Sequence, residues 1–470
     1  MPPRDYARAV DYLQRYLWQQ LPILPVERAL QARILTLLDH FGRPHERFPV
    51  AHVGGSAGKG STAAIVASIL QAAGLRTGLY TSPHLQTFVE RISVDGTLMP
   101  AEAFAREVLA LDPIVRRMHV EVLDGVGRGR PSLVEVAFAV GMHHFAQEAC
   151  EAAVVEVGLG GRTDCTNVFA APAVTMVTNV EFEHRERLGP DIASIAREKA
   201  AIIKGGIAVT GARRNEAVRI IEDRAAETGA TLWRLGREIR LRSHAQPPGE
   251  GSEVRITTPL GAVSGHLALD GAHQARNAAL AVAAAQAFGH RTGAPVTDAA
   301  VVDGLASVRI SGRLEVVQRA PVVLLDGAHN PAEARALADE LLRWRSPRRR
   351  IVVVCGILGD KEQAPMVRAL AAVADQVVVT KPPLEERAGD PARVVALFQA
   401  QLGARRVTFE RDPWRALDAA LTMARERDVV CVTGSLFLVG LLRGRWIPEG
   451  RILRRRSAAL DWRPARSLAR

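Results

Sequence analysis

A glycine-rich segment between two apolar runs constrains the fold of this 470-residue chain more than any other feature. The segment at 54–62, GGSAGKGST, follows the short apolar run 48–53 and precedes an apolar-periodic stretch at 63–73, which Gly74 closes. A second apolar run at 77–81 comes next. This order predicts a strand, a phosphate-binding turn, a helix and a second strand, which together form a unit that holds nucleotide phosphates.

The residue types in this turn suit an anion. Glycines such as Gly58 and Gly60 let backbone N–H groups approach a phosphate, and the start of the following helix adds partial positive charge. Lys59 adds a full charge, and Ser61 or Thr62 could place a hydroxyl on Mg²⁺. The glycine spacing differs from that of the common P-loop, so the alternative is a glycine-rich turn with an incidental lysine.

The composition is that of a globular protein large enough for two domains. Apolar residues make up 48% and charged residues 24% of the chain, and its length exceeds what one core usually holds. No uninterrupted apolar run is long enough to span a bilayer, and residues 1–17 favour an amphipathic helix over a signal peptide. The four cysteines lack metal-ligand spacing, which favours a reducing cytoplasm.

The net charge of +11 comes largely from arginine, with clusters at 345–350 and 451–456. Such clusters are typical of nucleic-acid binding, but they also attract small polyanionic substrates. Because no signature of a nucleic-acid-binding module occurs, we favour the second interpretation. We expect no membrane or nucleic-acid partner and a monomeric protein. A module that binds nucleic acid under the control of ATP is the remaining non-catalytic alternative.

Strands and helices alternate along most of the chain, which predicts an α/β fold with a mostly parallel sheet. We expect a P-loop-type N-terminal domain over residues 1–306 and a second, smaller α/β domain over residues 307–445 that closes over the nucleotide. A basic, poorly ordered tail is expected at 446–470. Within the first domain, residues 91–96 indicate an exposed turn and residues 230–270 a β-rich segment.

Several chemically apt residues follow predicted strands, where parallel sheets bind their ligands. These residues are Lys59, Ser82, Glu156 and His184. Each has an ordinary alternative, such as a carboxylate that caps a turn or a hydrogen-bonded loop histidine, but their convergence favours one shared site. Lys199 lies on the next predicted helix, where it could also belong to a solvated face.

The order of ten motifs resembles that of folylpolyglutamate synthase and dihydrofolate synthase, which belong to the Mur ligase superfamily. The resemblance runs from about residue 26 to residue 443. The matching segments are HVGGSAGKGST, GLYTSPHL, EVGLGGRTDCTNV, TNVEFEH, IAREKAAIIK, HQARNAAL, SGRLEV, LLDGAHNP, GILGDK and TGSLFLVG.

This resemblance implies an ATP-dependent ligase that adds L-glutamate to a reduced folate or to dihydropteroate through an acyl phosphate. It implies two Mg²⁺ ions and assigns residues to three groups. ATP contacts fall to Gly58, Lys59, Gly60, Ser61, Thr62, Asn277, Arg313, Asp326 and His329, with Ser435 near the phosphates and the glutamate. Metal ligands are Ser82, Glu156, His184 and a carbamylated Lys199. The catalytic residues are Lys59, His184 and Lys199.

Some positions depart from the family pattern. Ser56-Ala57, Glu183 and Ser311 replace the usual Thr-Asn, Asp and Pro, and these changes are close enough to keep ATP chemistry. Val134 replaces an aromatic residue in a region that the family associates with pterin recognition. A Mur-type ligase that joins an amino acid to another carboxylate is therefore an alternative.

Overall fold

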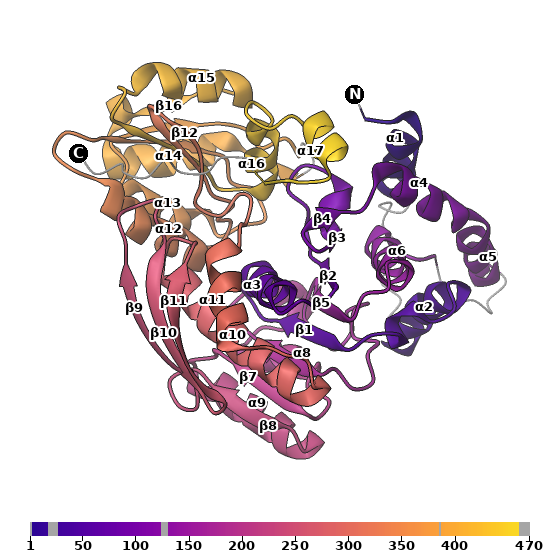
Figure 1. Cartoon of the computed structure of the whole chain (residues 1–470). Coiled ribbons are helices and arrows are strands. Elements are labelled where there is room, and N and C mark those ends of the chain that lie inside the picture. Colours follow the sequence, from indigo (N-terminus) through magenta and orange to yellow (C-terminus); the bar gives the residue numbers. More distant parts are fainter. Residues whose placement is uncertain (1, 17–26, 124–129, 385–386, 460–470) are drawn as a thin grey trace. The chain divides into compact units, whose positions relative to one another are not determined.

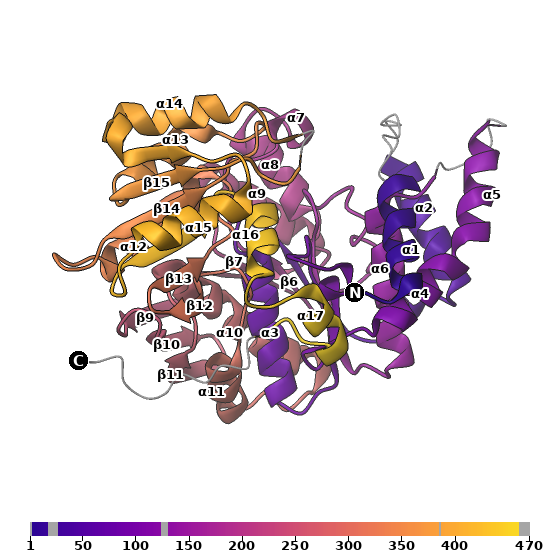
Figure 2. The same cartoon turned by 90° about the horizontal axis from the view of Figure 1, so that it is seen from above.

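The computed structural model describes residues 2–16, 27–123, 130–384 and 387–459. The chain separates into two compact units, Met1–Val308 and Arg309–Arg470 (Figures 1 and 2). Both units contain a sheet with helices packed against it, so the predicted α/β fold class is confirmed. No helix in the described ranges is both long and apolar enough to cross a membrane.

The first unit is organised around an eight-stranded sheet with the order β4-β3-β2-β5-β1-β6-β7-β8. All neighbouring pairs are parallel except those that involve β3 and β4. Its strands are β1 (Val50–Gly54), β2 (Thr77–Tyr80), β3 (Ile92–Val94), β4 (Thr97–Leu98), β5 (Ala152–Glu156), β6 (Val174–Val177), β7 (Ile207–Thr210) and β8 (Thr231–Arg234). The central strands β1, β5 and β6 are buried along their whole length, as expected for strands covered on both faces.

The helices of this unit follow the alternation that the sequence predicted. They are α1 (Arg4–Asp11), α2 (Glu27–His40), α3 (Lys59–Ala72), α4 (Ala101–Ala110), α5 (Asp112–Leu123), α6 (Leu133–Gln147), α7 (Arg185–Leu188), α8 (Ile192–Ala200), α9 (Asn215–Thr228), α10 (Ala272–Thr292) and α11 (Asp298–Ser307). Helix α3 packs against β1, β2 and β5 and also against α10 and α11 (Figure 1). It begins at Lys59, four residues before the predicted start, so the lysine of the glycine-rich turn lies in its first turn.

The predicted β-rich segment forms a separate antiparallel sheet with the order β11-β10-β9. Its strands are β9 (Arg240–Ala245), β10 (Ser252–Thr258) and β11 (Gly261–Leu267). Burial alternates along β10, which is the pattern of a strand with one covered face. Helices α10 and α11 pack against this sheet, so it extends the layer that covers α3.

The prediction of an exposed turn at 91–96 is wrong for most of the segment. Residues Ile92–Val94 form β3, which pairs with β2 and is buried, and only Asp95 and Gly96 are exposed. Arg91 is buried because its Nε donates to Nδ1 of His84 at 3.0 Å and its guanidinium lies over the ring of Phe88. Arg91 can therefore be buried, because side chains close to it in the sequence contact its guanidinium.

The second unit has a six-stranded sheet with the order β12-β13-β17-β14-β15-β16, in which only β12 runs antiparallel to its neighbour. Its strands are β12 (Glu315–Arg319), β13 (Val322–Leu325), β14 (Ile351–Cys355), β15 (Gln376–Val379), β16 (Val407–Phe409) and β17 (Val429–Thr433). Its helices are α12 (Pro331–Trp344), α13 (Gln363–Ala371), α14 (Pro391–Leu402), α15 (Pro413–Met423), α16 (Leu436–Arg443) and α17 (Glu449–Arg455).

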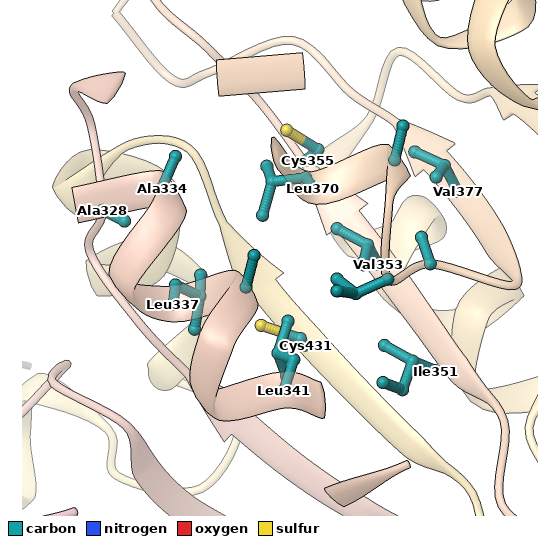
Figure 3. Packing of buried hydrophobic residues seen from close by; sticks show 14 of the residues in the cluster. Ala328, Ala334, Leu337, Leu341, Ile351, Val353, Cys355, Leu370, Val377 and Cys431 are labelled. Carbon is teal, nitrogen blue, oxygen red and sulfur yellow. The ribbon is translucent and has the colours of Figure 1, made fainter. Parts of the chain in front are cut away.

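One apolar core joins the sheet of the second unit to its helices. Leu337 and Leu341 of α12 pack with Val353 of β14 and Cys431 of β17, and Leu370 of α13 completes the layer (Figure 3). These side chains lie on helical and strand faces with the periods that amphipathic elements require. The core places α12 and the loop before it at the carboxyl end of β13.

The prediction of a poorly ordered tail from residue 446 is wrong for the first part of that segment. Residues Glu449–Arg455 form α17, and both Ile447 and Ile452 are fully buried. Arg443, just before this segment, is also buried, because its guanidinium pairs with Glu315 at 2.7 Å. Two apolar anchors were enough to order a segment rich in arginine. Residues 460–470 lie outside the described part of the chain.

Candidate functional site

The glycine-rich turn between β1 and α3 can only be made with glycine at two positions. Gly55 has φ +136° and Gly58 has φ +77°, a region that residues with a side chain rarely adopt. A Cβ at Gly55 would lie 1.9 Å from Oγ1 of Thr178, and one at Gly58 would lie 2.6 Å from Oδ1 of Asn277. The turn is therefore pressed against the end of β6 on one side and against α10 on the other.

Residues that follow β6 hold this turn in place. The Oδ1 atom of Asn179 accepts the N–H groups of Ser56 at 3.1 Å and Ala57 at 2.8 Å. The Oγ1 atom of Thr178 donates to the carbonyl of Ala57 at 2.7 Å, and Ser56 and Glu181 exchange two further hydrogen bonds. Two amides of the turn are thus used within the protein, which leaves the first amides of α3 to bind an anion.

Lys59 points back over the turn. Its Nζ donates to the carbonyl of Gly55 at 3.0 Å and to that of Ser56 at 3.4 Å. Ser61 is buried and its Oγ accepts from Nε2 of Gln274 at 3.3 Å, whereas Thr62 is fully buried and its hydroxyl has no hydrogen-bond partner among the described residues. A positive charge and the start of α3 therefore lie together at the carboxyl end of β1.

Helix α10 contributes two amide side chains beside the turn. Asn277 donates through Nδ2 to Oε1 of Gln274 at 3.0 Å, and its own Oδ1 is the atom that a Cβ at Gly58 would meet. The sequence predicted Asn277 near the nucleotide, and the structure brings it to the phosphate-binding turn. Gln274, which sequence reasoning did not single out, links α10 to Ser61.

Ser82 and Glu156 also meet at this edge. The backbone N–H of Ser82 donates to Oε2 of Glu156 at 2.8 Å, and Glu156 is buried. A Cβ at Gly60 would lie 3.3 Å from the same carboxylate oxygen, so Glu156 touches the start of α3. The strand ends of β2 and β5 thus bring a hydroxyl residue and a carboxylate to the phosphate-binding turn, as predicted from the sequence.

Lys199 is not on a solvated face of α8. Its side chain is 1% exposed, its Nζ donates to the carbonyl of Gly55 at 3.0 Å, and it forms a hydrogen-bonded ion pair with Glu183. Burial lowers the pKa of Lys199 to about 8, although the carboxylate of Glu183 opposes this shift. Burial alone would raise the pKa of Glu183, but Lys199 and then Lys59 lower it. The ion pair therefore sits directly beneath the phosphate-binding turn.

His184 lies next to this pair in the sequence. It has φ +40°, an unusual value for a residue with a side chain, and caps the short helix α7. Its Nδ1 lies 3.5 Å from Oε1 of Glu186, and its side chain is 37% exposed. The structure therefore holds His184 in an unfavourable backbone conformation beside Glu183, and the charge of His184 is one of those that lower the pKa of Glu183.

The donors at this edge suit a hard cation better than a soft one. Glu156 offers carboxylate oxygens and Ser82 a hydroxyl, which are the ligand types that Mg²⁺ prefers. Across the described ranges, no three His, Cys, Asp or Glu side chains are grouped closely enough to hold a metal ion. A complete shell at this position therefore requires other donors, such as Ser82, water or the phosphates of a nucleotide.

Three predicted nucleotide contacts lie in the second unit. Asp326, at the end of β13, is buried and accepts the N–H groups of Leu314 and Ala328, both at 2.9 Å. Burial raises its pKa, and Arg313 opposes this shift. His329 follows in the same loop and contacts Glu333. The structure thus groups Arg313, Asp326 and His329, which the family resemblance assigns to the nucleotide, at one strand end.

Three side chains of the first unit have structural partners that sequence reasoning missed. Glu135 is buried and forms a bidentate pair with Arg33 at 3.0 and 3.2 Å. Lys204, at the end of the segment that contains α8, donates to the carbonyls of Asn167 and Phe169. Asn179 could have been noticed as an amide that directly follows a strand at the ligand-binding edge.

Comparisons with known proteins agree with this geometry. Residues 131–285 match the family described as "Mur ligase middle domain", and residues 312–436 match "Mur ligase, glutamate ligase domain". A folylpolyglutamate synthase from Lacticaseibacillus casei is 35% identical over 416 residues, covering 87% of this chain and 93% of the relative. A dihydrofolate synthase/folylpolyglutamate synthase from Mycobacterium tuberculosis is 34% identical, covering 94% of this chain and 95% of the relative.

Solved structures are similar over nearly the whole chain. Mycobacterium tuberculosis folylpolyglutamate synthase complexed with ADP superimposes with a TM-score of 0.85 at 32% identity, covering 94% of this chain and 99% of that chain. A structure described as "FPGS-AMPPCP-folate complex" superimposes with a TM-score of 0.78 at 31% identity, covering 95% of this chain and 100% of that chain. The matched lengths leave little of either chain outside the shared fold.

Proposed function

The chain belongs to the folylpolyglutamate synthase and dihydrofolate synthase family of Mur ligases, and we propose that it joins L-glutamate to a reduced folate or to dihydropteroate. It is an ATP-dependent ligase that forms an amide bond. In the proposed reaction a substrate carboxylate attacks the γ-phosphate of ATP, which releases ADP and forms an acyl phosphate. The amine of L-glutamate then displaces inorganic phosphate.

The observation that carries this proposal is the set of groups gathered around the phosphate-binding turn. The first amides of α3 and Lys59 provide positive potential, while Glu156 and Ser82 lie against the start of the same helix. Charge spreads over the phosphoryl oxygens as they move, so fixed positive groups at this point lower the barrier. ATP-analogue and folate complexes of related structures support the same substrates for this chain.

Mg²⁺ is proposed as the metal, with Ser82, Glu156 and His184 as its protein ligands and a carbamylated Lys199 at a second ion. When bound there, it would screen the negative charge of the phosphates and the carboxylate that approach one another. Glu156 also serves the protein itself, because it accepts the N–H of Ser82 and so holds the end of β2 beside α3. Glu156→Gln keeps an oxygen that can accept this N–H, so removing the charge alone should affect metal affinity before it affects the fold.

Lys199 is proposed to carry a carbamate. Its neutral amine would attack CO₂ and lose one proton, and the lowered pKa of about 8 makes that neutral form accessible. Carbamylation would replace the ion pair with Glu183 by two neighbouring anions, and a bound cation would offset their repulsion. A pair of anions at this position fits a site with a second metal ion, and Glu183 would then lie close to that ion.

The remaining assignments stay predictions. We propose that the first unit holds the phosphates of ATP and that the second supplies Arg313, Asp326 and His329 to the nucleotide or to L-glutamate. A monomeric state is also proposed.

A Mur-type ligase with another carboxylate acceptor is the second candidate, and one observation favours it. Glu135 lies in the region that the family associates with pterin recognition, and its carboxylate is occupied by Arg33 and by Ser132. Val134 beside it offers no aromatic face. A pterin would therefore have to bind here without Glu135 as an open acceptor.

The decisive experiment incubates the purified protein with ATP, Mg²⁺, labelled L-glutamate and a panel of acceptors, with products identified by mass spectrometry. The panel contains dihydropteroate, reduced folates and carboxylates without a pterin ring. We expect one glutamate to be added to a pterin-containing acceptor, with ADP formed in equal amount. Transfer only to acceptors without a pterin selects the second candidate, and no transfer to any acceptor refutes both.

A further inference from the structure

A carboxylate in the second unit makes several contacts with one histidine. Glu333 lies in the first turn of α12, four residues after His329. Its Oε2 atom lies 3.1 Å from Nδ1 of His329 and accepts the backbone N–H of the same residue at 3.0 Å. The Oδ1 atom of Asn330 accepts the N–H of Glu333 at 2.9 Å and caps the helix. The backbone and side chain of Glu333 are therefore both held in position.

These contacts determine which ring nitrogen of His329 carries a proton. Nδ1 lies 3.0 Å from the carbonyl oxygen of Gly327 as well as beside Glu333. A carbonyl and an ionised carboxylate can only accept hydrogen bonds, so Nδ1 is the donor in both contacts. Nε2 has no hydrogen-bond partner within the described ranges. It is therefore the nitrogen that can meet a reactant.

The surrounding charges favour the positively charged form of this imidazole. Glu333 raises the pKa of His329 more than burial lowers it, and Arg313, which lies just before β12, opposes the rise. Burial would raise the pKa of Glu333, but His329 and then Arg313 keep it below its ordinary value. Glu333 therefore stays ionised, and an anion beside Nδ1 stabilises the imidazolium.

We propose that Glu333 is a positioning residue that holds His329 as an imidazolium, so that its Nε2–H is a charged donor to an anionic oxygen of the reactants. The proposal rests on the proposed function, because the anion is either a carboxylate of L-glutamate or an oxygen of the transferring phosphate. Without Glu333, the same ring would present an unprotonated Nε2, which accepts a proton rather than binding an anion.

The charge of Glu333 can be removed without removing its hydrogen-bonding atom. Glu333→Gln keeps an oxygen that can accept the N–H of His329 but lacks the negative charge. We expect the pKa of His329, followed by NMR of ¹³C-labelled histidine and assigned with His329→Asn, to fall by about one unit. Glu340→Gln is the matched control, because it removes a buried carboxylate of α12 that pairs with Arg343 at 2.6 Å. An unchanged pKa of His329 in Glu333→Gln overturns the proposal.

Kinetics with the full-length enzyme identify the anion. A rise of about tenfold in KM for L-glutamate alone in Glu333→Gln assigns the glutamate carboxylate, whereas a fall of about tenfold in kcat with both KM values unchanged assigns the phosphate. If Glu333→Gln changes neither the KM for L-glutamate nor kcat, the proposal is overturned. The alkaline limb of the pH profile of kcat/KM should move to lower pH in Glu333→Gln, since a protonated His329 is required. Movement of the acid limb instead would identify His329 as a base and also overturn it.

A double variant separates this role from helix capping. If Glu333 acts through His329, Glu333→Gln combined with His329→Asn should be no slower than His329→Asn alone. Additive losses would assign Glu333 to the stability of α12 and refute the positioning role. If the wild-type enzyme transfers glutamate to no acceptor, the proposed function fails, while the NMR titration still tests the effect of Glu333 on His329.

Discussion

Asn179→Ala should loosen the phosphate-binding turn while leaving the rest of the first unit intact. The side chain accepts two amide N–H groups of the turn, but they do not depend on it equally. The N–H of Ser56 also donates to the backbone carbonyl of Asn179 at 3.0 Å, so it keeps one acceptor after the change. The N–H of Ala57, at 2.8 Å from Oδ1, loses its acceptor.

The expected cost follows from this difference. One hydrogen bond lost outright and one weakened correspond to about 1 to 2 kcal/mol. If the turn must regain its shape when the nucleotide binds, this energy appears as weaker binding, by about 5- to 30-fold in Kd. The remaining contacts of Thr178 and Glu181 with the turn should keep the unfolding temperature within a few degrees of the wild-type value.

Calorimetric titration with AMPPCP and a thermal melt measure the two quantities separately. Asn215→Ala is the matched control, since it makes the same substitution at the exposed start of α9. Asn179→Asp adds a second comparison, because it keeps an acceptor for Ala57 but places a negative charge near the phosphates. It should preserve the melting temperature and still weaken binding. A Kd for Asn179→Ala equal to that of Asn215→Ala would refute the reasoning.

Three further predictions concern the charged groups around the turn. Lys59→Ala should lower kcat by about a hundredfold or more at saturating ATP with an unchanged melting temperature, because the transferring phosphoryl charge loses a fixed cation; near-wild-type kcat would contradict this. Glu156→Gln should raise the Mg²⁺ concentration needed for half-maximal activity more than the KM for the acceptor, and an equal midpoint would assign Glu156 to structure. Lys199→Ala should lose most activity and regain part of it with added short carboxylates. Lys204→Ala should lower the melting temperature, because its contacts with Asn167 and Phe169 are lost, and should keep its kcat. A fully active Lys199→Ala protein together with an inactive Lys204→Ala protein would exclude Lys199 from the site.

Local signals were sufficient for the fold class, the family and the central unit of the first domain. The glycine-rich turn was predictable because glycine is needed wherever φ is positive and a neighbour approaches closely, as at Gly55 and Gly58. The convergence of Ser82 and Glu156 was predictable for a different reason. Both follow strands of a parallel sheet, and the carboxyl ends of such strands meet at one edge.

Errors occurred where long-range partners decided the outcome. Arg443 is buried because Glu315, 128 positions away in the sequence, pairs with its guanidinium. Arg91 is buried for a different reason, because the nearby side chains of His84 and Phe88 contact its guanidinium. The segment that contains α17 was expected to be poorly ordered because it is rich in arginine. Two apolar side chains, Ile447 and Ile452, decided otherwise by packing into the second unit.

The sequence by itself determined the phosphate-binding turn, the α/β alternation and the strand ends at which ligands bind, because these depend on glycine geometry and on periodicity over a few residues. Only the tertiary structure decided that Asn179 holds the turn, that Lys199 lies buried against Glu183, and that Glu333 lies beside Nδ1 of His329. The first of these contacts joins residues more than 100 positions apart, and the other two depend on burial and orientation. None of these properties has a local signature, since each is set by what the folded chain places around the side chain.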